Sequence, residues 1–188
     1  LIPREHIALA TVALNAPFLN TFGATETGLV PATGSLIPIG EIPTSLSKRQ
    51  SAFCDVRLVD PDDNEVAVGE PGEVAISGPT LFSGYWDNDK VNVSDFRGGR
   101  FHMGDVLRRN PDGTLDYVDR VKYMIKSGGE NIYPAEIEQV IEADERVETA
   151  VVVRKEDERW GEVPVLLVVA NTDTVTAKEL MELCERDL

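Results

Sequence analysis

Hydrophobic and polar positions alternate through the middle of the chain, and this alternation predicts β-strands. The segments CDVRLVD (54–60) and VAISG (74–78) alternate with a period of two residues, and the turn-rich PDDNEVAVGEPGE (61–73) lies between them. NPDGTLDYVDR (110–120) contains an Asp-Gly pair typical of a hairpin. We therefore predict a β-rich region, barrel-like or a sandwich, over about 51–121.

Residues 1–50 show a different pattern, in which short apolar runs are broken by Gly, Pro, Thr and Ser. No helical period is sustained there, so the pattern predicts no amphipathic helix. We assign this stretch, together with the β-rich region, to one domain over 1–121.

After residue 121 the hydrophobic pattern becomes that of a helix. YPAEIEQVIEAD (133–144) places Pro134 in a first helical turn, where proline is tolerated. Ile137, Val140 and Ile141 then fall on one helix face. The pattern predicts a helix that buries this face.

Two strands and a second helix follow. VETAVVV (147–153) and VPVLLVVA (163–170) are typical of strands. In TAKELMELCERDL (176–188), Thr and Glu three residues apart form a capping box. The capping pair and the expected apolar face are Thr176 and Glu179, and Ala177, Leu180, Met181 and Cys184. We predict a second, smaller α/β domain over 122–188 that is incomplete, and a mixed α/β fold class for the chain.

The net charge narrows the range of partners. The 188 residues include 33 acidic and 18 basic side chains, a net charge of −15. Such a surface repels nucleic-acid backbones and anionic headgroups, so we expect no nucleic-acid partner. The basic residues Arg120, Lys122 and Lys126 are a local exception, and they indicate a small anionic ligand.

Length of apolar runs and cysteine spacing indicate the compartment. The run at 163–170 is less than half of what spans a bilayer, and no signal peptide opens the chain. Cys54 and Cys184 are far apart and lack metal-ligand spacing, so we interpret both as buried small side chains in a reduced, cytoplasmic protein. The sequence gives no indication of the oligomeric state.

TFGATETG (21–28) is the first candidate site. Gly23 permits close approach of a ligand, and Phe22 offers an aromatic face. Thr25 can donate a hydroxyl to phosphate, and Glu26 is a carboxylate of the kind that holds Mg²⁺. The alternative is an ordinary polar turn.

RFHMGDVL (100–107) is the second candidate. Asp105 follows a glycine and can accept hydrogen bonds from two neighbouring hydroxyls, as in ribose binding. The alternative is a turn-forming Asp that bonds its own backbone. His102 is expected to be a packed side chain, because the sequence nearby supplies no orienting partner.

The third candidate is the basic stretch itself. Lys122 and Lys126 are four residues apart, which is also compatible with a solvated helix face. Gly128 and Gly129 argue against a long helix and suit the passage of a narrow ligand close to the main chain.

Taken in order, these segments resemble the adenylate-forming (AMP-binding) superfamily, which includes acyl- and aryl-CoA synthetases. TFGATETG resembles its aromatic-Gly-x-Thr-Glu motif, and FHMGD (101–105) resembles Phe-His-Thr-Gly-Asp. GEPGEVAISGPTLFSGYWDN (69–88) is similar to its Gly-Glu…Gly-Tyr-Trp motif. VDRVKYMIKSGGENIYPAEIE (118–138) and VVRKEDERWGEVPVLLVV (152–169) resemble the hinge and the start of its mobile C-terminal domain.

The resemblance implies a role for each candidate residue in the first domain. Thr25 and Glu26 would be catalytic, with Thr25 touching phosphate and Glu26 holding Mg²⁺. Asp105 would accept from the ribose hydroxyls with Arg120 assisting. The expected adenine border is Phe22 and Gly23, and the expected wall of the acyl pocket is Thr27 and Gly28.

The same resemblance implies roles at the junction with the second domain. Lys122 would be the hinge, and Lys126 a catalytic residue that rotation turns toward the site. Gly128 and Gly129 would line the tunnel for the pantetheine arm of CoA. The implied activity is an AMP-forming acid–CoA ligase, which uses ATP, CoA and a carboxylic acid and passes through an acyl-adenylate. SGGEN (127–131) favours CoA ligases over luciferases and peptide synthetases, but fatty and aromatic acids remain equally compatible.

The sequence also departs from the family pattern. Met103 stands where the family usually has Thr, and we expect a minor effect. The family's phosphate loop and its C-terminal adenylation Lys have no counterpart in residues 1–188, and Lys126 does not replace that Lys. We therefore expect a fragment, covering the end of the large domain and the start of the small one, that is inactive alone. A carrier-protein-loading adenylation domain and a non-catalytic binding remnant are the alternatives.

Overall fold

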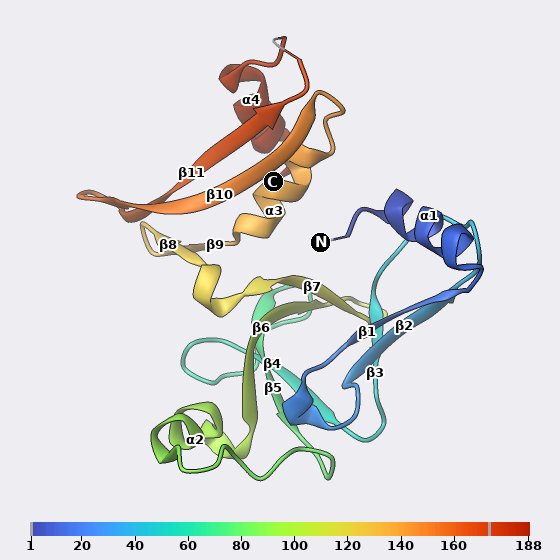
Figure 1. Cartoon of the computed structure of the whole chain (residues 1–188). Coiled ribbons are helices and arrows are strands. Elements are labelled where there is room, and N and C mark those ends of the chain that lie inside the picture. Colours follow the sequence, from blue (N-terminus) through green and yellow to red (C-terminus); the bar gives the residue numbers. More distant parts are fainter. Residues whose placement is uncertain (1, 173) are drawn as a thin grey trace. The chain divides into compact units, whose positions relative to one another are not determined.

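The chain forms two compact units in the computed structural model, which describes residues 2–172 and 174–188 (Figure 1). The first unit is Ile2–Tyr117 and the second begins at Val118 and ends at Leu188. Each unit is described by itself. The mixed α/β class is confirmed, while a hinge at Lys122 stays a prediction.

The first unit is built on a long sheet. Its helical elements and strands, in chain order, are α1 (Arg4–Leu14), β1 (Phe18–Phe22), the 3₁₀ turn η1 (Thr25–Thr27), β2 (Ala32–Ile37), β3 (Lys48–Gln50), β4 (Asp55–Val59), β5 (Pro71–Ser77), α2 (Asp89–Asp95), the turn η2 (Arg97–Gly99), β6 (Phe101–Arg109) and β7 (Leu115–Arg120). The seven strands lie in the order β1-β2-β3-β7-β6-β5-β4, and β7 leads into the second unit. The end strands β1 and β4 are not neighbours in this order, so the described sheet is open at both edges.

The strands predicted from alternation are present, and alternation explains their burial. In β4, Val56 and Leu58 are buried and pair with Ile76 and Val74 of β5. The core cluster of this unit consists of Phe22, Ala32, Cys54, Val56, Leu58, Val74, Ile76, Leu107 and Leu115. The predicted hairpin also forms, because Asp112 accepts hydrogen bonds from the backbone and hydroxyl of Thr114 at 3.0 and 2.6 Å.

Residues 1–50 contain a helix, α1, although no sustained helical period in the sequence predicted one. α1 buries Ile7, Ala8 and Thr11, and the Thr11 hydroxyl accepts a hydrogen bond from the Gly40 backbone at 2.9 Å. The apolar side chains of α1 point to more than one side of the helix, and those of Leu9, Val12 and Leu14 are exposed. The sequence therefore shows no single apolar stripe, although tertiary contacts hold the helix in place.

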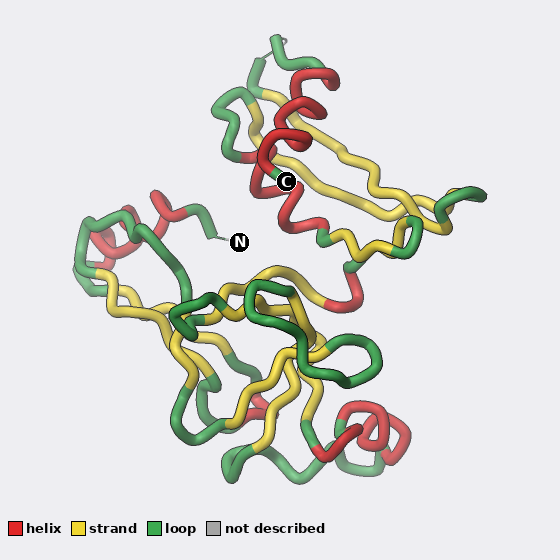
Figure 2. The backbone as a smooth tube through the Cα atoms, turned by 180° about the vertical axis from the view of Figure 1, so that it is seen from behind, coloured by secondary structure: helices red, strands yellow, loops and turns green. Residues whose placement is uncertain are grey.

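The second unit is a smaller sheet covered by two helices. Its elements are the turn η3 (Val121–Tyr123), β8 (Ile125–Ser127), β9 (Glu130–Ile132), α3 (Pro134–Glu142), β10 (Val147–Asp157), β11 (Gly161–Ala170) and α4 (Ala177–Asp187). The sheet order is β10-β11-β8-β9. Figure 2 shows α3 and α4 together on one side of the long β10–β11 hairpin.

The packing of this unit follows the two-residue period of its strands. The core cluster is Ile141, Val147, Ala150 and Leu180, with Leu166 and Val168 packed against it. The paired residues Val151 and Leu167 face the other side and are 46% and 56% exposed. This face of the hairpin is apolar and uncovered among the described residues.

The predicted helices form with one change of face. α3 begins with Pro134 in its first turn, and Ile141 is fully buried. In α4, Leu180 and Cys184 contact the core as predicted, but Met181 is 64% exposed and Leu183 packs inward in its place. Ala177, which was also predicted on the apolar face, is exposed, so the buried face of α4 is shifted from the predicted one toward Leu183.

α3 is capped by a residue that precedes it by several elements. Its own N-cap residue, Tyr133, makes no side-chain capping bond. Asp119, at the end of β7, accepts hydrogen bonds from the backbone N–H groups of Ala135 at 3.1 Å and Arg120 at 2.7 Å. Its side chain is only 5% exposed, so the carboxylate is well placed to offset the unpaired N–H groups and positive dipole end of the helix.

The two cysteines are free, as expected. Cys54 is buried, and Cys184 is half-buried, where burial raises the pKa of its thiol. Across residues 2–172 and 174–188, no helix combines the length and apolar character needed to cross a bilayer.

Gly128 and Gly129 form the turn of the β8–β9 hairpin. Both have positive φ, +60° and +95°, as a two-residue type I′ turn requires. The Gly128 N–H donates to the Trp160 carbonyl at 2.9 Å, and a Cβ at Gly128 would lie 2.6 Å from Cε3 of the Trp160 ring. A Cβ at Gly129 would meet no atom within 4 Å.

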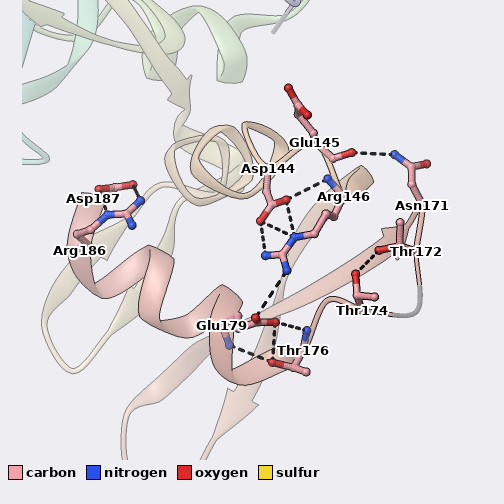
Figure 3. Close-up of polar contacts among 10 residues, drawn as sticks. All are labelled: Asp144, Glu145, Arg146, Asn171, Thr172, Thr174, Thr176, Glu179, Arg186 and Asp187. Carbon is pink, nitrogen blue, oxygen red and sulfur yellow. Dashed lines mark hydrogen bonds and ion pairs between the residues drawn. The ribbon is translucent and has the colours of Figure 1, made fainter.

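A cluster of charged and polar side chains fastens α4 to the loop after α3 (Figure 3). Asp144 forms a two-pronged ion pair with Arg146, at 2.7 Å between Oδ2 and Nη2, and Arg146 also approaches Glu179 at 3.6 Å. Glu179 and Thr176 form the predicted capping box. The hydrogen bonds from Arg146 lower the pKa of Asp144 to about 2.

We expect Asp144→Asn to lower the free energy of unfolding at neutral pH. In acid this loss of stability should disappear. The folded-state pKa of Asp144 lies below its unfolded value of 3.8, so its stabilisation is present above about pH 4 and is lost as pH falls toward 2. Urea unfolding of both forms between about pH 5 and pH 2.5 measures the difference. The difference in midpoint should shrink with acid, and a constant difference would contradict the assignment.

We expect Gly128→Ala to destabilise the chain more than Gly129→Ala. Both changes place a Cβ on a left-handed backbone, but only the first drives it into the Trp160 ring. The extra loss should be on the order of 1–3 kcal/mol, the usual cost of overpacking. Urea unfolding of the two variants provides the comparison, and equal losses would show that the ring moves aside freely.

Candidate functional site

The first candidate motif is a compact turn closed by its own threonine. The Thr27 hydroxyl donates to the Ala24 carbonyl at 2.7 Å and accepts from the Ala24 N–H at 3.3 Å. Thr27 is 1% exposed. Its side chain thus holds the turn, while Thr25 lies exposed beside it. A place for Thr27 in an acyl-pocket wall stays a prediction.

Two glycines let this turn pack closely against other segments. Gly28 has φ +67°, and a Cβ there would lie 2.3 Å from the Thr80 carbonyl oxygen. At Gly23 a Cβ would come within 3.0 Å of the Pro31 ring. The turn therefore lies directly on the segment around Thr80, 52 residues further along the chain. Phe22 is 9% exposed and belongs to the core cluster, so little of its ring remains available to border an adenine.

Glu26 lies at the contact between the two segments. Its carbonyl accepts from the Phe82 N–H at 2.9 Å, and its Oε1 accepts from the Tyr85 hydroxyl at 3.0 Å. The side chain is half-buried. In the described part of the chain Oε2 accepts no hydrogen bond, which leaves one carboxylate oxygen available to a ligand.

The donor set around Glu26 suits a cation that keeps most of its own ligands. Among the described residues, no three His, Cys, Asp or Glu side chains come together as a metal cage. A single carboxylate fits Mg²⁺, which is usually held by one or two carboxylates with water and phosphate oxygens. Glu26 is therefore the residue that would hold Mg²⁺ in this segment.

The second motif lies in β6. Asp105 is 8% exposed and follows Gly104, whose φ is +71°. Met103 packs against the core cluster, and the minor effect expected of its replacing Thr stays a prediction. A role for Asp105 in ribose binding stays a prediction.

His102 is a packed side chain, as predicted, and is 6% exposed, but the reason given for that prediction, the lack of an orienting partner, is wrong. Its Nδ1 lies 3.3 Å from Glu73, and its Nε2 lies 3.8 Å from Asp63. Arg97 bridges the same two carboxylates at 2.6 and 2.9 Å. His102, Asp63 and Arg97 also line a small pocket of about 110 Å³, together with Arg57 and Arg100. The partners come from β5 and from the turn before it, which sequence proximity to His102 cannot reveal.

The basic stretch does not form a helix. Lys122 lies in the 3₁₀ turn η3 and Lys126 in strand β8, so the alternative of a solvated helix face is wrong. The Lys122 ammonium lies 4.7 Å from the Tyr123 ring centroid, and its carbonyl accepts a hydrogen bond from Arg154. Lys122, Lys126 and Arg120 are all exposed. Their roles as hinge, catalytic and ribose-assisting residues stay predictions.

Sequence reasoning missed three side chains that organise these motifs. Tyr85 was quoted within a motif but given no role, and Asp119 and Trp160 were not singled out. Trp160 is 47% exposed, carries the Arg159 guanidinium 4.6 Å from its ring centroid and covers Gly128. A tryptophan directly before a glycine in a short hairpin loop was the available signal.

Known families match both ends of the chain. The profile of the AMP-binding enzyme family matches residues 2–86, and that of the AMP-binding enzyme C-terminal domain matches residues 136–188. Feruloyl-CoA synthase of an Amycolatopsis species is 44% identical over 132 residues, which are 70% of this chain and 27% of that protein. The 2-succinylbenzoate–CoA ligase of Bacillus licheniformis is 37% identical over 172 residues, 92% of this chain and 35% of that protein. The chain thus spans about a third of the length of these curated relatives.

Solved structures agree with this relationship. The o-succinylbenzoate CoA synthetase of Bacillus subtilis, in complex with its acyl-adenylate intermediate, aligns with a TM-score of 0.75 at 30% identity over 96% of this chain and 37% of that one. The amide bond synthetase of Marinactinospora thermotolerans aligns at 0.80 and 25% identity over 99% of this chain and 38% of that one. Because both parts of the chain match in sequence order and in fold, the chain belongs to the AMP-binding, or adenylate-forming, enzyme family.

Proposed function

We propose that the protein carrying this sequence is an AMP-forming acid–CoA ligase. In the first step a carboxylate oxygen attacks the α-phosphorus of ATP, and pyrophosphate leaves. In the second step the CoA thiol attacks the carbonyl of the acyl-adenylate, AMP leaves, and the thiol proton passes to solvent. The names of the CoA ligases similar to this chain support the choice of acceptor.

The observation that carries the proposal is the setting of Glu26. One carboxylate oxygen is held by Tyr85, and the other has no hydrogen bond among the described residues. This is the arrangement that a carboxylate needs to receive a cation accompanied by polyphosphate. When bound there, Mg²⁺ would stabilise the charge that develops on the pyrophosphate leaving group.

The remaining residues are assigned around this carboxylate. Thr25, exposed at the start of the turn, offers its hydroxyl to a phosphate oxygen. Asp105 accepts from the ribose hydroxyls, with Arg120 assisting. Lys126, exposed on β8, acts when the small domain turns toward the site, and Lys122 is the hinge.

The pantetheine arm is assigned to the β8–β9 turn. Gly129 is exposed, and a side chain there would contact nothing in its own unit. A ligand can therefore lie along this backbone. Gly128 is excluded from carrying a side chain by Trp160, which leaves Gly129 as the position where a substitution would act on the ligand.

We expect Glu26→Gln and Asp105→Ala, each made in the native protein, to depress acid-dependent ATP–pyrophosphate exchange by about 10²-fold or more, because each removes a charged contact to the nucleotide. Exchange of labelled pyrophosphate into ATP measures the first step alone. Arg57→Lys, on an exposed side chain that we assign to no step, is the control. Normal exchange in both variants would show that neither Glu26 nor Asp105 belongs to the nucleotide site.

We expect Gly129→Leu to leave this exchange intact and to abolish thioester formation, because only the second step uses the β8–β9 turn. Gly129→Ala carries the same backbone strain with a short side chain, so it should retain most thioester formation. The measurement is acyl-CoA yield beside pyrophosphate exchange, with a holo-carrier protein as the competing acceptor. Equal loss of both steps would contradict the tunnel assignment, and transfer only to the carrier would favour an adenylation domain.

A further inference from the structure

Tyr85 joins two motifs that lie about sixty residues apart in the chain. We propose that it is a positioning residue, whose hydroxyl fixes the Glu26 carboxylate in the orientation that receives a divalent cation. The hydroxyl donates to Glu26 Oε1 at 3.0 Å. This inference rests on the proposed function for the cation itself, but the role of Tyr85 follows from contacts within the first unit.

The ring of Tyr85 is fixed by aromatic packing. It meets Phe82 edge to face, with centroids 4.9 Å apart at 71°, and Phe82 meets Phe101 in the same way at 5.1 Å. Phe82 also donates its backbone N–H to the Glu26 carbonyl. The same short segment therefore holds Glu26 at its main chain and at its carboxylate.

The backbone of Tyr85 is fixed separately by Asn92. The Tyr85 N–H donates to Asn92 Oδ1 at 2.7 Å, and Asn92 Nδ2 donates to the Tyr85 carbonyl at 2.9 Å. A Cβ on the preceding Gly84, whose φ is +130°, would lie 3.0 Å from the same Asn92 oxygen. α2 thus holds Tyr85 by a reciprocal pair of bonds that requires glycine beside it.

The contact fixes one of the two carboxylate oxygens. The Tyr85 hydroxyl donates its hydrogen bond to Glu26 Oε1 and leaves Oε2 facing away from this donor. With Oε1 held in this way, the Glu26 side chain presents Oε2 without having to give up rotational freedom when the cation arrives.

The test is the Mg²⁺-dependent gain in ATP affinity, measured calorimetrically without acid or CoA. Native protein and Tyr85→Phe are titrated with ATP in Mg²⁺ and again in EDTA. Loss of a hydrogen-bonded partner behind a metal ligand typically costs 10–100-fold in metal affinity. We expect the gain from Mg²⁺ to fall about tenfold or more in Tyr85→Phe, with ATP binding in EDTA unchanged.

Matched variants separate positioning from folding. Tyr123→Phe removes a hydroxyl that makes no hydrogen bond in the described part of the chain, and it should leave the gain unchanged. Asn92→Ala keeps the Tyr85 hydroxyl but removes the two hydrogen bonds that hold the Tyr85 backbone. It should therefore lower the Mg²⁺-dependent gain in ATP affinity by a smaller factor than Tyr85→Phe. In a Glu26→Gln background, Tyr85→Phe should have no further effect.

The outcomes are distinct. A full Mg²⁺-dependent gain in Tyr85→Phe overturns the inference, and so does an equal loss of ATP affinity in EDTA, which would indicate a merely structural bridge. If native protein binds ATP with no gain from Mg²⁺, the proposed cation site fails, and the inference falls with it. If native protein gains affinity that Glu26→Gln retains, the cation lies elsewhere and Tyr85 has no such role.

Discussion

The first unit depends on the close approach of the 24–28 turn to the segment that begins at Gly78. Gly28 rests on the Thr80 carbonyl, where even one methyl group would overlap, and Glu26 accepts the Phe82 N–H. This contact joins residues more than fifty positions apart in the chain, so neither segment alone can form it. Tertiary contacts consequently fix the position of the Glu26 carboxylate, and the 24–28 turn sets only the direction in which its side chain points.

The second unit is held together by a hydrophobic core and by ion pairs. One face of its β10–β11 hairpin is buried under α3 and α4, and the ion pair of Asp144 with Arg146 closes the loop between α3 and β10. The basic residues Lys122 and Lys126 lie outside this core and remain exposed.

Local rules predicted much of the fold, and the failures occur where contacts are distant. The Thr176–Glu179 capping box, Pro134 in a first turn and the Asp-Gly hairpin are set by neighbouring residues, and the structure contains all three. α1 was missed because apolar residues surround it, so its face is selected by contacts such as Gly40 with Thr11. The candidate site divides in the same way. Glu26 was identified by its motif, whereas the partners of Glu26 and His102 lie far along the chain and leave no local pattern.

The remote cap on α3 has a consequence for dividing the protein. Asp119 lies before the predicted hinge, yet both of its oxygens serve backbone groups of the second unit, one of them in the first turn of α3. A C-terminal piece that starts at Lys122 would leave behind the carboxylate that completes its first helix. A piece that starts at Val118 would keep it. The start of the compact second unit and the predicted hinge at Lys122 are therefore different positions in this chain, separated by the four residues from Val118 to Val121.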